Sequence, residues 1–196
     1  MKGRSPQIVD PQKSIDLFLK RYIEMWELPT IQKGFKASLK HHNDFIKNEI
    51  TSELIEPDNE GLRALLTYWR KFVFDTLSPY RLDKIFDICR SLTDEDCKQR
   101  LGSARRHFNR IKNKRTGFNL PRNGKLLTPE EYVKIWLNGE IFHDNIDDVE
   151  FLASFNPAIL DIYKFEFLSF VSKMLNVIRY VAHEVKNAKQ NGWFQF

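Results

Sequence analysis

The stretch Pro157–Val185, PAILDIYKFEFLSFVSKMLNVIRYVAHEV, is the most apolar part of the chain and decides the predicted fold. Drawn as a helix, it is apolar over roughly two-thirds of its surface, and such a helix lies inside a bundle or a subunit interface. Its polar residues form one stripe at three- and four-residue steps, which includes Arg179 and His183. Charged residues interrupt the stretch, and each costs about 2.5–3.5 kcal/mol at the centre of a bilayer, so we predict a largely buried helix of a soluble protein without a membrane span.

Helical spacing of apolar residues continues toward the N-terminus. It predicts a helix through Ile15–Trp26, another through Leu62–Val73 and a short one through Arg81–Ser91. A further helix is expected to start at Thr93, whose hydroxyl can cap the first turn of a helix that opens with acidic residues.

One region alone suggests β structure. Asn123-Gly124 favours a tight two-residue turn, and the segments on either side allow a small β-hairpin at 118–127. We therefore predict an all-α fold, a multi-helix bundle with a long apolar C-terminal helix. Residues 1–10 are expected to form a flexible tail and residues 11–196 a single helical domain.

Positive charge is concentrated in one segment. The 196 residues include 31 Lys and Arg against 26 Asp and Glu, a net charge of +5. Residues 97–129, the basic segment, contain ten of these cations and no acid, which leaves a net −5 on the other 163 residues. The ten are Lys98, Arg100, Arg105, Arg106, Arg110, Lys112, Lys114, Arg115, Arg122 and Lys125. With 16 Phe, 6 Tyr and 4 Trp, the chain is too aromatic to be disordered.

A run of cations without anions attracts phosphates, so the basic segment predicts a nucleic-acid-binding protein, for DNA or RNA. Arg105, Arg106, Asn109 and Arg110 are expected to make the closest contacts. The residues expected to hold phosphates are Lys98, Lys112, Lys114, Arg115, Arg122 and Lys125. Two alternatives stay open: an inhibitor or adaptor role in which the basic face grips an acidic protein partner, and a face that is merely solvated or docked on the acidic body.

Within this segment, residues 94–113 resemble a helix-turn-helix. Taking Gly102-Ser103 as the turn, Cys97, Leu101, Phe108 and Ile111 occupy the apolar positions of the motif, and Phe108 is expected in the core. The resemblance implies that a second helix enters the major groove, as part of a basic subregion at 81–127. A homodimer through the C-terminal helix would suit two DNA half-sites.

Arg100 and His107 are separated by six residues, which resembles the Arg…His pair of HEPN ribonucleases, helical-bundle enzymes that cut RNA. The residue after the Arg, usually polar in that family, is Leu101 here. The resemblance implies His107 as the acid or base and Arg100 on the scissile phosphate. A metal-independent ribonuclease is thus an alternative to a non-enzymatic binding protein.

An acidic stretch offers the remaining candidate site. Glu140, His143, Asp144 and Asp147 lie close together in a segment without cations, and such residues can hold Mg²⁺ or place a carboxylate–His dyad. We favour the simpler interpretation that these acids form a loop and start a helix near Asp147. No cofactor is predicted.

The two cysteines, Cys89 and Cys97, have no metal-site spacing and are expected to be reduced thiols of a cytoplasmic protein, with a disulfide between them as the alternative.

Overall fold

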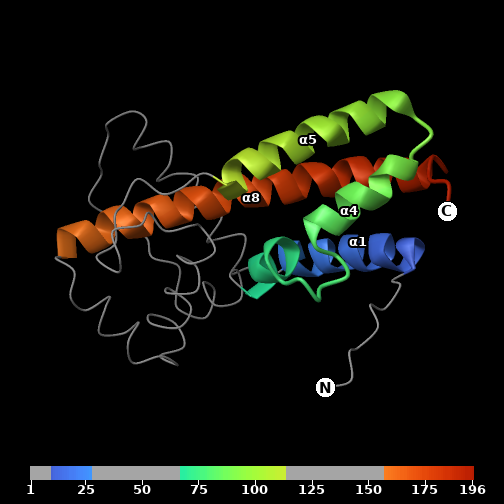
Figure 1. Ribbon diagram of the computed structural model, residues 1–196. Coiled ribbons are helices and arrows are strands. Elements are labelled where there is room, and N and C mark those ends of the chain that lie inside the picture. Colours follow the sequence, from blue (N-terminus) through green and yellow to red (C-terminus); the bar gives the residue numbers. More distant parts are fainter. Residues whose placement is uncertain (1–9, 28–66, 114–156) are drawn as a thin grey trace, which may run out of the picture.

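The computed structural model describes residues 10–27, 67–113 and 157–196, and the regular elements in these ranges are helices (Figure 1). In chain order they are α1 (Pro11–Glu27), α4 (Leu82–Ile88), the 3-10 helix η1 (Cys89–Ser91), α5 (Glu95–Asn113) and α8 (Pro157–Gln190). Residues 67–73 are also helical. The all-α prediction is confirmed, and so is the predicted helix at 81–91, as α4 followed by η1. The allowed hairpin at 118–127 lies outside the described residues.

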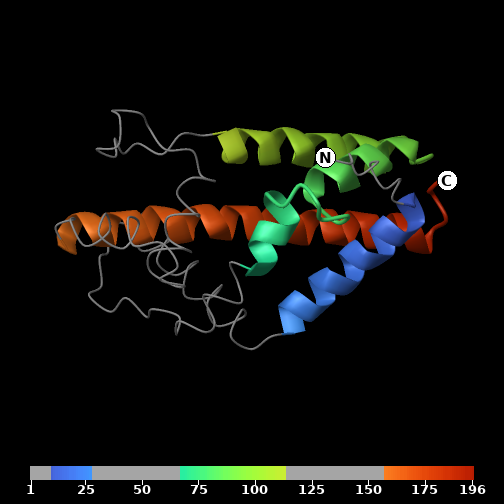
Figure 2. The ribbon, with the colours of Figure 1, turned by 60° about the horizontal axis from the view of Figure 1, so that its bottom comes forward.

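The 34-residue helix α8 packs against α5 and α1, and α4 packs against α1 and α5. Figure 2 shows α5 running along α8 while α1 crosses it obliquely. From Lys173 onward the buried side chains of α8 recur at helical spacing: Met174, Leu175, Val177, Ile178, Val181, Ala182, Glu184, Val185 and Ala188. No helix in the described ranges is both long and apolar enough to cross a membrane.

Helix α1 begins at a local signal and is held by its apolar face. The side chain of Asp10 accepts a hydrogen bond from the backbone N–H of Gln12 at 2.9 Å, and Pro11 fills the first helical position. Ile15 and Phe18 are fully buried, and the ring of Phe18 meets that of Phe72 edge-on, with centroids 5.6 Å apart.

The start of α5 differs by one residue from the prediction. Asp94, not Thr93, caps the helix: its Oδ1 accepts from the backbone N–H of Cys97 at 2.7 Å. Thr93 instead donates from both its backbone N–H and its hydroxyl to the carbonyl oxygen of Trp193, at 2.8 and 3.0 Å. Thr93 does not cap the helix because its hydroxyl is bonded to Trp193, 100 residues further along the chain. The side chain of Asp94 instead accepts from a first-turn amide, which has no partner within the helix.

The C-terminus turns back onto this junction. Gly192 has a positive φ of 66°, and the N–H groups of Gly192 and Trp193 bond the carbonyls of Lys189 and Ala188, which ends α8 in a Schellman motif. Phe194 then pairs with Leu92 in an antiparallel bridge. The start of α5 is thereby fixed beside the end of α8.

The helix break predicted at Gly102-Ser103 is wrong, because α5 is one continuous helix of 19 residues. Glycine inside a helix costs only about 1 kcal/mol relative to alanine. Leu101 and Phe108, on either side of it, are both buried, and their burial outweighs that cost. The two-helix geometry expected of a helix-turn-helix at 94–113 is therefore not formed.

Candidate functional site

Helix α5 presents four sides, and the buried one holds it in place. The residues on the buried side of α5 recur at alternating steps of four and three, as expected for a helix that packs along one stripe. They are Cys97, Leu101, Ala104, Phe108 and Ile111. The core position predicted for Phe108 is confirmed, since its ring is fully buried, 5.8 Å from that of Phe86 in α4.

The side of α5 that faces α4 is electrically paired. Arg105 Nη1 lies 3.0 Å from Asp87 Oδ1, and Lys112 Nζ lies 3.1 Å from Asp83 Oδ2. Lys98, on the same side, pairs within α5 with Glu95 at 2.6 Å. These three predicted nucleic-acid contacts thus already have carboxylate partners in the protein.

The outward side of α5 is different. Arg106, Asn109 and Arg110 are all exposed, and none of them has a hydrogen-bond or ion-pair partner among residues 10–27, 67–113 and 157–196. The guanidinium of Arg106 lies back along the helix, with Nη1 only 3.9 Å from where a side chain at Gly102 would begin.

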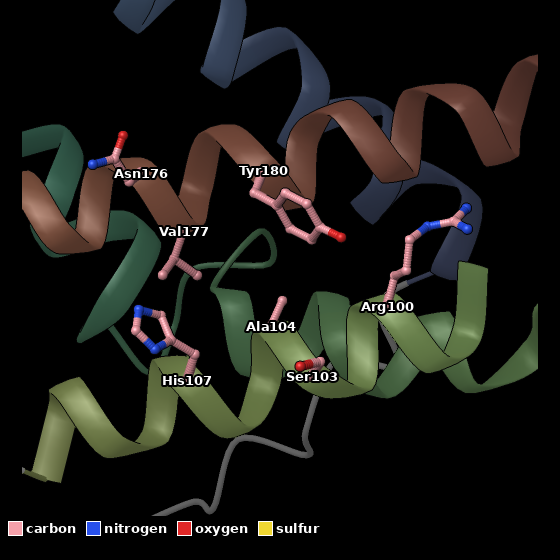
Figure 3. A pocket seen from close by; sticks show the side chains of 7 residues that line it. All are labelled: Arg100, Ser103, Ala104, His107, Asn176, Val177 and Tyr180. Atoms are coloured by element: carbon pink, nitrogen blue, oxygen red, sulfur yellow. The ribbon is translucent and has the colours of Figure 1, made fainter. Parts of the chain in front are cut away.

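The fourth side of α5 meets α8 in a hollow of about 270 Å³. From α5 the hollow is lined by Arg100, Ser103, Ala104 and His107, and from α8 by Asn176, Val177 and Tyr180 (Figure 3). Because α5 is unbroken, Arg100 and His107 stand seven residues apart on one helical face, about 10 Å along the axis. The structure therefore brings the two residues of the Arg…His pair to one hollow.

A buried carboxylate supports one end of the hollow. Glu184 is 7% exposed, and its Oε2 accepts a hydrogen bond from Arg100 Nε at 3.0 Å. This hydrogen bond raises the pKa of Arg100. The Sγ atom of Cys97 lies 3.8 Å from the same carboxylate oxygen, and burial, reinforced by the charge of Glu184, raises the pKa of the Cys97 thiol.

Tyr180 stands in the middle of the hollow. In Figure 3 its ring reaches from α8 toward α5, with the hydroxyl toward Arg100, and His107 lies on the other side of it. The side chain is 42% exposed, and desolvation followed by the charge of Glu184 raises the pKa of its phenol. The hollow thus combines a cation, an imidazole and an accessible aromatic ring.

Sequence reasoning placed Asn176 on the polar stripe of the C-terminal helix but missed Tyr180 and Glu184, which with Asn176 form the α8 side of the site. The four-residue spacing of the three is the signal that places them on one helical face. Arg179 and His183, the two residues of the polar stripe named in the sequence analysis, are exposed and do not line the hollow. His183 instead lies 3.3 Å from Asn187 through Nδ1.

Several predicted site residues lie outside the described residues: Lys114, Arg115, Arg122, Lys125, Glu140, His143, Asp144 and Asp147. Within the ranges that the structure describes, no group of three His, Cys, Asp or Glu side chains is arranged to hold a metal ion. Cys89 and Cys97 are both buried and free.

The chain matches no protein-family model, no curated protein and no solved structure.

Proposed function

We propose that the protein binds nucleic acid, DNA or RNA, through the outward side of α5. The observation that carries this proposal is the contrast between two sides of one helix. Arg105 and Lys112 are paired with aspartates of α4, whereas Arg106 and Arg110 are exposed and have no acidic partner in the described residues.

The chemistry of this side suits a phosphate backbone. Arg106 and Arg110 lie about 6 Å apart along the helix axis, and each presents forked donors that match phosphate oxygens. Asn109 stands between them and adds an amide, which can bond a phosphate or a base edge. In the sequence, five more cations follow Arg110 before Pro129 without an intervening acid.

The proposal is tested with two double variants that remove equal charge. Arg106→Gln/Arg110→Gln neutralises the exposed pair, and Arg105→Gln/Lys112→Gln neutralises the pair that faces α4. Affinity for a labelled oligonucleotide is measured by fluorescence anisotropy across a salt series. The exposed double variant should bind more weakly and lose about 1.4–1.8 from the slope of log K against log salt, for two lost phosphate contacts.

The control double variant should keep most of both the affinity and the slope. Equal effects of the two variants would contradict the proposal. So would the absence of oligonucleotide binding at low salt, and co-purification with an acidic protein would then favour the alternative partner. The homodimer through α8 and the cytoplasmic location stay predictions that accompany this function.

One observation favours a second candidate function, a metal-independent ribonuclease: Arg100 and His107 line the same hollow. In such a cleavage the 2′-oxygen of ribose attacks the adjacent phosphorus while the bond from phosphorus to the 5′-oxygen breaks. The products are a 2′,3′-cyclic phosphate and a 5′-hydroxyl, to which the displaced proton passes. His107 is the candidate carrier of that proton and Arg100 the candidate stabiliser of charge on the phosphate.

Two histidine variants decide between cleavage and binding alone. Purified protein is incubated with RNA in the presence of a chelator, and the ends of the products are identified. His107→Ala should lower the rate by about 100-fold or more, the usual contribution of a general acid or base. His183→Ala, an exposed histidine of α8 outside the hollow, should cleave like the wild type. Unchanged cleavage by His107→Ala would reject the assignment.

A further inference from the structure

We propose that the hollow between α5 and α8 receives an unpaired nucleobase stacked on Tyr180, so that single-stranded nucleic acid is the class of ligand. This inference rests on the proposed nucleic-acid binding. It adds a preference for single strands, which the phosphate contacts on the outward side of α5 cannot supply. Phosphate contacts alone do not distinguish single from double strands, whereas a site for a base does.

The first observation is the setting of Tyr180. Among the described residues, four large apolar or aromatic side chains are exposed: Ile23, Leu77, Tyr180 and Phe196. Tyr180 is the member of this set that lines the hollow. Its hydroxyl makes no hydrogen bond to any other described residue. An accessible ring in a concave site is a suitable platform for a base, because every base has a face that can stack.

The second observation is what surrounds the ring. Arg100 and His107 flank Tyr180 along α5, and Ser103 and Asn176 add a hydroxyl and an amide from the two helices. Arg100 can contact the phosphate of a nucleotide whose base lies on the ring. The hydroxyl of Ser103 and the amide of Asn176 can bond the edge of that base.

The third observation is that the hollow adjoins the proposed phosphate-binding side. His107 follows Arg106 directly in α5, and Arg110 is three residues further on, so these side chains share neighbouring strips of the helix surface. A strand whose phosphates contact the two arginines passes the rim of the hollow. A base within a duplex stays in its stack, whereas an unpaired base can turn into the hollow.

The test compares one strand with its duplex. The probe is a fluorescein-labelled oligonucleotide of about 12 nucleotides, within the range of known single-strand sites. It is prepared as DNA and as 2′-O-methyl RNA, alone or annealed to its complement. Neither chemistry has a free 2′-hydroxyl, so binding is measured without cleavage. Wild-type protein should prefer the single strand in at least one chemistry.

Substitutions at the ring give the decisive result. Tyr180→Ala should weaken single-strand binding by about 5- to 150-fold, the range that corresponds to one lost base–aromatic stack, and leave duplex binding unchanged. Tyr180→Phe keeps the ring and should bind within about twofold of wild type. Phe196→Ala, an exposed aromatic outside the hollow, is the matched control and should have no effect.

A filling variant keeps the test valid if Tyr180→Ala does not fold. Ser103 is exposed, so Ser103→Trp places a large side chain at the hollow without disturbing the core, and it should lower single-strand binding while sparing the duplex. Equal affinity of wild type for strand and duplex, or unchanged single-strand binding by Tyr180→Ala and Ser103→Trp, overturns this inference and leaves the proposed function standing. Failure of every oligonucleotide to bind at low salt overturns both.

Discussion

The Nε atom of Arg100 in α5 lies 3.0 Å from Oε2 of Glu184 in α8, and this ion pair joins the two helices at the edge of the candidate site. The pair is asymmetric, since the arginine side chain is 46% exposed and the glutamate side chain 10%. Glu184 uses one oxygen to hold Nε, so the guanidinium is oriented by a group that solvent barely reaches. We therefore expect substitutions of Arg100 and of Glu184 to lower the free energy of unfolding by different amounts.

Removing one partner should cost more than removing the other. Arg100→Gln leaves a buried carboxylate without its cation, whereas Glu184→Gln leaves a half-exposed guanidinium that water can solvate. We therefore expect Arg100→Gln to lower the free energy of unfolding by about twice as much as Glu184→Gln. The double variant should be more stable than Arg100→Gln alone. Urea denaturation of the four proteins measures this, and equal losses from the two single variants would contradict it.

The continuity of α5 predicts that Gly102→Ala stabilises the protein. Alanine in a helix interior is favoured over glycine by about 0.5–1 kcal/mol. The added Cβ would lie 3.9 Å from Nη1 of Arg106, an ordinary contact. Gly192→Ala is the control with opposite sign, because its φ of 66° should cost alanine about 1 kcal/mol or more. Chemical denaturation checks both, and destabilisation by Gly102→Ala would point to a turn at that position.

A pH-dependent contribution is expected from Asp75. The hydrogen bond from Lys71, aided by the backbone N–H of Leu77, holds the pKa of this carboxyl below its ordinary value. A lowered folded-state pKa contributes stability above the unfolded value of about 3.9, and this is lost as the pH falls through the folded-state pKa.

The matching variant is Asp75→Asn, which keeps an oxygen for Leu77 but loses the charge. It should be less stable than wild type by about 0.5 kcal/mol near neutral pH, as for other partly exposed pairs. The difference should shrink toward zero in acid, as the pH falls from the unfolded value of about 3.9 through the lower folded-state pKa. Urea titrations at both pH values measure it, and a difference that persists or grows in acid would refute the role given to the charge.

The cysteines are expected to be unreactive in the folded protein. Burial raises the pKa of Cys89 to about 12, and Cys97 is fully buried beside Glu184. Thiol reagents attack the thiolate, so neither residue should be modified under mildly alkaline native conditions. Both should react after denaturation, and the count of thiols in the two states checks this. Rapid modification of Cys97 in the native protein would mean that α5 and α8 separate readily.

Local signals in the sequence were sufficient for some features and insufficient for others. Asp10 and Pro11 start α1 by contacts within the first turn, which need no distant partner. Thr93 and Asp94 are both competent caps, and a carbonyl oxygen of Trp193 decided between them. Gly102 carries a genuine local preference for a break, but the burial of the residues around it is a property of the packed bundle.

In the candidate site too, some residues could be found from local sequence signals and others only from the tertiary structure. Arg100 and His107 were found from their spacing because both belong to one helix. Tyr180 and Glu184 lie about 80 residues further along the chain, and only the register of α8 against α5 brings them to the arginine. Their own spacing places them on one face of α8 without showing which helix that face meets.

The sequence by itself determined the helical class of this protein and the segment in which its cations gather, because periodicity and composition are local properties. Only the tertiary structure decided which of those cations are engaged: Arg105 and Lys112 meet aspartates of α4, while Arg106 and Arg110 meet no acid among the described residues. The physical reason is range. An ion pair forms only when packing carries a carboxylate to within about 4 Å, and spacing along one helix does not specify what a second helix brings to that distance.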